Sequence, residues 1–210
     1  MRVSGTDKFM KTMGKIAMND NGRKKPRLHV IPGGLHRSAE YGPVRIVAAP
    51  ENAPPFSVDA MTYEEDTFLI MSADPEDVPP DIHPIRLMAE LEAFKPKEIG
   101  SVIVKNGNPL KLLAVVHDVN KEPTCRGKWV EKALQAVFRE VERRGIQSLG
   151  MPLLATRHGR LPCSRFAQLL SRVLAQNDFQ SLKKLWIVAP VPDNCDVISA
   201  LEENFYLNPS

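Results

Sequence analysis

The sequence has few aromatic residues, few cysteines and no long apolar run. Phe, Trp and Tyr make up only 6% of its 210 residues. No apolar stretch approaches the roughly 18 residues that a membrane-spanning helix needs. The first residues also lack the apolar segment of a secretory signal. We therefore expect a cytoplasmic protein with no membrane contact.

The three cysteines, Cys125, Cys163 and Cys195, are an odd number and lie far apart in the sequence. Their spacing matches neither a disulfide framework nor a zinc site, and the histidines do not complete one. We therefore expect no metal ion, no cofactor and a reducing environment.

The remaining composition is that of a globular domain, with 43% hydrophobic and 25% charged residues. The charge is uneven. Residues 1–40 hold nine Lys or Arg and three acids, whereas the rest of the chain holds 19 basic and 22 acidic residues. We predict a basic, flexible arm over residues 1–40 and one folded domain over residues 41–210. The arm is a candidate contact for nucleic acid, and a solvated leader is the alternative.

Hydrophobic periodicity predicts that strands and helices alternate in the folded domain. The predicted strands are 44–49, 67–71, 101–104, 112–116, 146–154 and 185–189. The predicted helices are 84–94, 128–144, 164–174 and 195–202. This order indicates a layered α/β domain whose sheet is largely parallel in its second half. Ligands of such sheets bind at the carboxyl ends of the strands, which directs attention to the loops 72–83, 154–163 and 189–195.

Two segments resemble the macro domain family. Residues 112–119, Leu-Leu-Ala-Val-Val-His-Asp-Val, resemble a family strand of apolar residues followed by His-x-Val. Residues 148–162 resemble a strand ending in proline and a phosphate loop of the form Gly-x-Gly-x-x-Gly. The matching positions in that segment are Pro152, Thr156, Gly159 and Pro162. The resemblance covers roughly residues 100–203 and extends more loosely to Tyr41. It implies the macro-domain fold, with three α/β/α layers and a mixed central sheet, and a site for ADP-ribose or a related nucleotide.

Two loops depart from the family pattern. The glycines around Thr156 are replaced by Ala155 and Arg157, although glycine there lets backbone N–H groups approach a diphosphate and accepts a positive φ. Another family loop follows a strand that ends in Asn-Ala-Ala-Asn and continues into glycines. Here Ser72, Ala73 and Asp74 stand after the predicted strand, and prolines replace the glycines. This asparagine and these glycines position the distal ribose in hydrolytic members, so we expect no efficient hydrolysis.

The resemblance implies a binding site that is drawn from several loops. The predicted ligand-binding residues are Asp59, Ser72, Ala73, Asp74, Ala155, Thr156, Arg157, His158, Gly159, Arg160, Pro192 and Asp193. Asp59 would contact the adenine, and the diphosphate would lie on the backbone N–H groups of residues 156–159 and on the Arg157 guanidinium. His117 is expected to be a packed residue, and no catalytic residue is assigned.

The leading hypothesis is a binding module for ADP-ribose or a related nucleotide diphosphate. The first alternative is an interaction or scaffold domain with a vestigial pocket, whose basic arm contacts nucleic acid or a protein partner. The second alternative is a hydrolase of ADP-ribosyl or ADP-ribose-phosphate bonds, with Asp74 or His158 as the acid–base group. The sequence indicates no particular protein partner.

Overall fold

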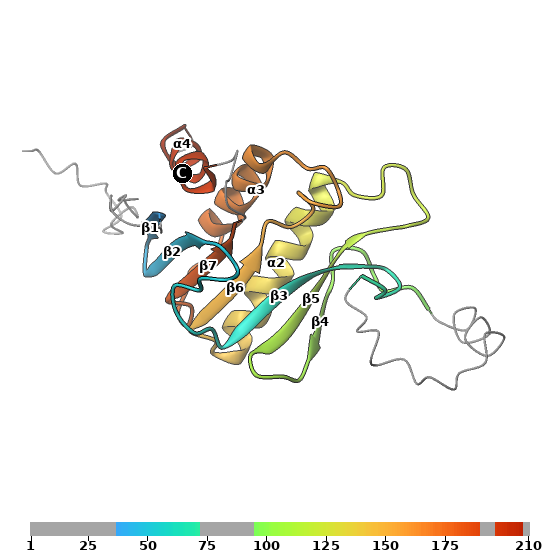
Figure 1. Ribbon diagram of the computed structural model, residues 1–210, viewed down its shortest axis with the longest axis horizontal. Coiled ribbons are helices and arrows are strands. Elements are labelled where there is room, and N and C mark those ends of the chain that lie inside the picture. Colours follow the sequence, from blue (N-terminus) through green and yellow to red (C-terminus); the bar gives the residue numbers. More distant parts are fainter. Residues whose placement is uncertain (1–36, 72–94, 190–195, 208–210) are drawn as a thin grey trace, which may run out of the picture.

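A seven-stranded mixed sheet forms the centre of the computed structural model, which describes residues 37–71, 95–189 and 196–207 (Figure 1). The strands are β1 (Arg37–Tyr41), β2 (Val44–Ala49), β3 (Ala60–Asp66), β4 (Val102–Lys105), β5 (Leu110–His117), β6 (Ser148–Pro152) and β7 (Lys184–Val188). Their order in the sheet is β1-β2-β7-β6-β3-β5-β4. The five strands from β2 to β5 in this order are parallel, and the outer pairs β1–β2 and β4–β5 are antiparallel. The predicted α/β class with a mixed central sheet is therefore confirmed.

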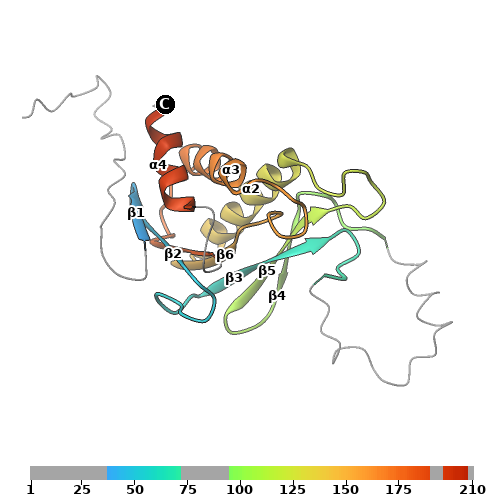
Figure 2. The same ribbon diagram turned by 45° about the horizontal axis from the view of Figure 1, so that its top comes forward.

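The described helices are α2 (Gly127–Arg144), α3 (Cys163–Ala175) and α4 (Val197–Leu207). They lie on one face of the sheet, where α3 packs between α2 and α4 (Figure 2). The buried residues of α2 run from Trp129 to Val141, and the helix is followed by Gly145, which has a φ of 68°. The predicted helix 84–94 lies outside the described residues.

The predicted strand 67–71 is wrong, because the strand in this region is β3 and ends at Asp66. Residues 67–71 form a turn in which Leu69 has a φ of 62°. The apolar side chains Ile70 and Met71 are 56% and 38% exposed. The run Thr-Phe-Leu-Ile-Met has the composition of a strand, but the carboxylate of Asp66 accepts backbone N–H groups that would otherwise pair with a neighbouring strand.

The folded part includes β1, which begins at Arg37 inside the segment predicted as a flexible arm. Residues 1–36 lie outside the described part, so the nucleic-acid contact expected of them stays a prediction. The expectation of reduced cysteines is also corrected, since Cys163 is disulfide-bonded, whereas Cys125 is free and buried. Among the described helices, none has the length and apolar character needed to cross a bilayer.

Candidate functional site

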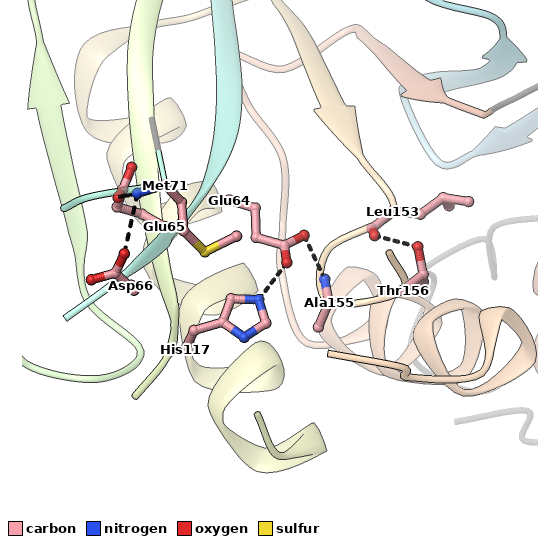
Figure 3. Close-up of polar contacts among 8 residues, drawn as sticks. All are labelled: Glu64, Glu65, Asp66, Met71, His117, Leu153, Ala155 and Thr156. Atoms are coloured by element: carbon pink, nitrogen blue, oxygen red, sulfur yellow. Dashed lines mark hydrogen bonds and ion pairs between the residues drawn. The ribbon is translucent and has the colours of Figure 1, made fainter. Parts of the chain in front are cut away.

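The site is built at the carboxyl ends of β3, β5 and β6, and Glu64 lies at its centre (Figure 3). One carboxylate oxygen of Glu64 is paired with Nε2 of His117, the last residue of β5. The other oxygen accepts the backbone N–H of Ala155, which follows β6, at 2.8 Å. The two side chains are only 11% and 5% exposed. Glu64 therefore ties three neighbouring segments together at one edge of the sheet.

The next two residues of β3, Glu65 and Asp66, are also acidic and buried, with exposures of 0% and 1%. Glu65 accepts the N–H of Met71 at 2.8 Å. Asp66 accepts the N–H groups of Phe68 and Ile70 at 2.6 and 3.1 Å. Because buried carboxylates are costly without hydrogen-bond partners, these contacts explain how β3 carries three acids into the interior. They also shape the turn that follows the strand.

The loop between β6 and α3 begins with a buried inner half, residues 153–155. Thr156 donates its hydroxyl to the carbonyl of Leu153 at 2.7 Å, and the N–H of Leu161 donates to the carbonyl of Ala155 at 3.0 Å. Ala155 has a φ of 64°, so it adopts the conformation that glycine would take more easily. At Gly159, a Cβ would lie 2.8 Å from both the Ala155 carbonyl oxygen and the Cys125 Cβ. The loop is therefore closed tightly on itself.

The outer half of this loop, residues 157–160, has a different character. The side chains of Arg157, His158 and Arg160 are exposed. Among the described residues, no group accepts the backbone N–H groups of residues 157–160. The α3 helix begins three residues later, at Cys163, and its first turn adds a positive partial charge. Unpaired donors and cationic side chains together make the outer half suited to an anion.

Two neighbouring groups do not extend the chemistry of the site. Burial, together with the charge of Glu64, raises the pKa of the Cys125 thiol to about 11, so this thiol is protonated at neutral pH. The Asp118 carboxylate turns to Lys121 and the N–H of Asn120, and its hydrogen bond to Lys121 lowers its pKa. Within the described ranges, no group of three His, Cys, Asp or Glu side chains is placed to hold a metal ion.

The structure brings together six of the predicted binding residues, Ala155 to Arg160, on one loop. It places Asp59 at the opposite edge of the sheet, where its carboxylate accepts the N–H groups of Gln147 and Ser148 at 3.1 and 2.8 Å. Asp59 therefore does not share a site with the loop. The other five predicted binding residues lie outside the described residues. They are Ser72, Ala73, Asp74, Pro192 and Asp193.

Sequence reasoning missed Glu64, because its partners are 53 and 91 residues away in the chain. It also placed the wrong residues at the strand end. The strand in this region, β3, ends in Tyr63, Glu64, Glu65 and Asp66, and not in the segment 71–74. The available signal was the run of three acids, Glu64 to Asp66, which stands between two apolar segments of the sequence.

Comparison with known proteins supports the architecture. No family model matches the sequence, and no curated protein matches it. Among solved structures, a mutant macrodomain of Oceanobacillus iheyensis with ADPR aligns at a TM-score of 0.57 and 14% identity, covering 83% of this chain and 100% of that one. The O. iheyensis macrodomain with ADP aligns at 0.54 and 13%, covering 86% and 97%. A Trypanosoma brucei macrodomain in complex with ADP aligns at 0.51 and 15%, covering 76% and 68%.

These likenesses define the class of fold: the chain has the macrodomain fold. The resemblance first indicated by residues 112–119 and 148–162 is thereby confirmed at the level of the fold.

Proposed function

We propose that this protein is a binding module for ADP-ribose or a related nucleoside diphosphate, with a phosphate group on the outer half of the loop after β6. The observation that carries the proposal is the run of four backbone N–H groups, 157–160, that have no acceptor among the described residues. The first and last residues of this run, Arg157 and Arg160, carry charged donors. Backbone N–H groups and guanidinium groups are the donors that phosphate oxygens prefer. Macrodomain structures with ADPR and ADP support the same class of ligand.

The geometry favours binding over hydrolysis. A general base must reach the proton that it removes from the substrate or from water. The carboxylate of Glu64 is held by His117 and Ala155, and His117 is 95% buried. The thiol of Cys125 is protonated at neutral pH, so it does not supply a nucleophile. Neither group supports the hydrolase alternative, whose expected acid–base groups were Asp74, which lies outside the described residues, and His158, which is exposed.

The test is calorimetric titration of the full chain with ADP-ribose, ADP and AMP. We expect binding of ADP-ribose that weakens about tenfold in Arg157→Ala, since one charge-assisted hydrogen bond is lost. Arg143→Ala is the matched control, because it removes the same charge from the last turn of α2, at the opposite edge of the sheet. It should bind like the wild type. If the wild type bound none of the three nucleotides, the proposed function would be rejected.

A further inference from the structure

Glu64 makes with the loop the contact that a bound anion would make. Its carboxylate oxygen accepts the backbone N–H of Ala155 at 2.8 Å. A phosphate oxygen on such a loop forms the same charge-assisted hydrogen bond. The inner N–H at residue 155 is therefore occupied by a side chain of the protein itself, whereas the outer N–H groups at residues 157–160 have no acceptor among the described residues.

The contact is fixed from both sides. A buried carboxylate loses much of its hydration, and this loss is tolerated only when partners replace the water. Glu64 has two such partners, Nε2 of His117 and the N–H of Ala155 (Figure 3). Both partners belong to the buried edge of the sheet, since the exposure of His117 is 4% and that of Ala155 is 0%. The carboxylate therefore cannot swing away without leaving a buried donor unpaired.

The backbone of the loop also holds Ala155 against this carboxylate. Ala155 stays in the left-handed region, at a φ of 64°, although this conformation is unfavourable for a residue with a Cβ. The carbonyl of Ala155 accepts the N–H of Leu161, and the absence of a side chain at Gly159 lets the loop close over it. The N–H of residue 155 is thus held on Glu64, whereas the N–H groups of residues 157–160 are available to a ligand.

We propose that Glu64 is a specificity-determining residue, which closes the inner anion position of the loop to ligands. The inference rests on the proposed function and deepens it. One phosphate group binds at the outer N–H groups, and a second phosphate group gains no contact at residue 155. The wild-type site therefore distinguishes poorly between a nucleoside diphosphate and a nucleoside monophosphate. Removal of the Glu64 side chain opens the inner position and creates that distinction.

The test is a titration with inorganic pyrophosphate, followed through the backbone amide signals of the ¹⁵N-labelled full chain. In the wild type, the amides of residues 157–160 should shift and the amide of Ala155 should not. In Glu64→Ala, the Ala155 amide should shift as well, and the ratio of ADP affinity to AMP affinity should rise about tenfold. Glu65→Gln is the matched control. It changes the neighbouring carboxylate of the same strand, which accepts the N–H of Met71 and not that of Ala155. It should behave like the wild type.

Glu64→Gln keeps the test decisive if Glu64→Ala does not fold. Its carboxamide oxygen still accepts the Ala155 N–H, so this amide should stay silent while residues 157–160 respond. A response of the Ala155 amide in the wild type or in Glu64→Gln would overturn the proposed role of Glu64. A folded Glu64→Ala without such a response would overturn it too. If residues 157–160 failed to respond in every variant, the proposed function itself would fall, and the role of Glu64 with it.

Discussion

The two edges of the sheet use carboxylates in the same way but differ in what they leave open. At the amino edge, Asp59 accepts the backbone N–H groups of Gln147 and Ser148 at the start of β6, and Glu142 accepts backbone N–H groups that precede β7. At the carboxyl edge, Glu64 and Asp66 do the same for the segments after β6 and β3. A carboxylate that accepts backbone N–H groups therefore does not mark one edge of this sheet as functional.

What distinguishes the carboxyl edge is the outer half of the loop after β6. Its backbone N–H groups at residues 157–160 have no acceptor among the described residues, and the same run carries the exposed cationic side chains of Arg157 and Arg160. At the amino edge, the corresponding N–H groups of Gln180, Ser181 and Leu182 are all donated to Glu142. The comparison indicates that N–H donors without an acceptor among the described residues, and not the acids, distinguish the edge where we propose that the ligand binds.

The largest effect on stability is expected from Glu142→Ala, which removes hydrogen bonds at the amino edge of the sheet only. Three backbone N–H groups lose a charged acceptor, so we expect a loss of about 3 kcal/mol in the free energy of unfolding. Thermal unfolding should show a melting temperature lower by about 6–12 °C. Glu140→Ala is the control, since its ion pairs with Arg143 and Arg144 are exposed, and it should cost less than about 1 kcal/mol. Equal losses in the two variants would argue against a stabilising role for the hydrogen bonds that Glu142 accepts.

A somewhat smaller effect is expected from Gly159→Ala, which disturbs the carboxyl edge. The new Cβ would meet the Ala155 carbonyl oxygen and the Cys125 Cβ at 2.8 Å, so the loop must shift. Overpacking of this kind costs about 2 kcal/mol, and ADP-ribose affinity should fall together with stability. Gly127→Ala is the control, because its Cβ would make only ordinary contacts at 3.6 and 3.7 Å. Unchanged affinity in Gly159→Ala would show that the loop tolerates the shift.

The next effect is a pH dependence of the amino edge. Partial burial alone would raise the pKa of Glu142, but the N–H donors of Leu182, Ser181 and Gln180 outweigh burial and lower it. A carboxylate whose pKa is lowered by folding stabilises the protein above its unfolded pKa, and this stabilisation is lost as the pH falls through the folded pKa. The stability difference between the wild type and Glu142→Gln should therefore be constant above about pH 6 and shrink below about pH 4. Denaturant unfolding at a series of pH values measures this stability difference. A difference that grew on acidification would contradict the stabilising role of the Glu142 carboxylate.

The smallest effect is expected from Arg126→Ala, just before α2. The guanidinium lies 5.3 Å from the centroid of the Trp129 ring, and such contacts at exposed sites contribute about 0.5 kcal/mol. Lys128→Ala removes an exposed charge two residues further along, and it provides the baseline. A melting-temperature difference of about 1–2 °C between the two variants would confirm the contact. A larger loss in Lys128→Ala would be inconsistent with it.

The sequence predicted those parts of the fold that local patterns determine. The helices α2 and α3 follow from a 3.6-residue apolar period, and the central residues of β2 and β7 follow from short β-branched runs. The loop after β6 followed from the predicted strand and helix on either side of it, and its prolines, Thr156 and Gly159 carried the resemblance to the macro domain. These features depend on neighbours within one segment of the chain.

The parts that were missed depend on residues far apart in the chain. The pair Glu64–His117 forms because β3 and β5 are adjacent in the sheet, and no local spacing indicates that adjacency. The turn at 67–71 was misread because its apolar residues have high strand propensity, while the acids that end β3 suggest a loop. Tertiary pairing reversed both assignments, since the acids found backbone donors and the apolar side chains of Ile70 and Met71 became exposed.

Ala155 adopts a backbone conformation that glycine would take more easily. It keeps a φ of 64° without being glycine, because Glu64 accepts its N–H and its carbonyl accepts the N–H of Leu161, while Thr156 bonds to Leu153 across it. The shape of the loop is thus encoded by its surroundings rather than by its own glycines. Glycine patterns are consequently a poor guide to loops of this kind, and a redesign that restores Gly at residue 155 would alter the ease of the turn while leaving its course intact.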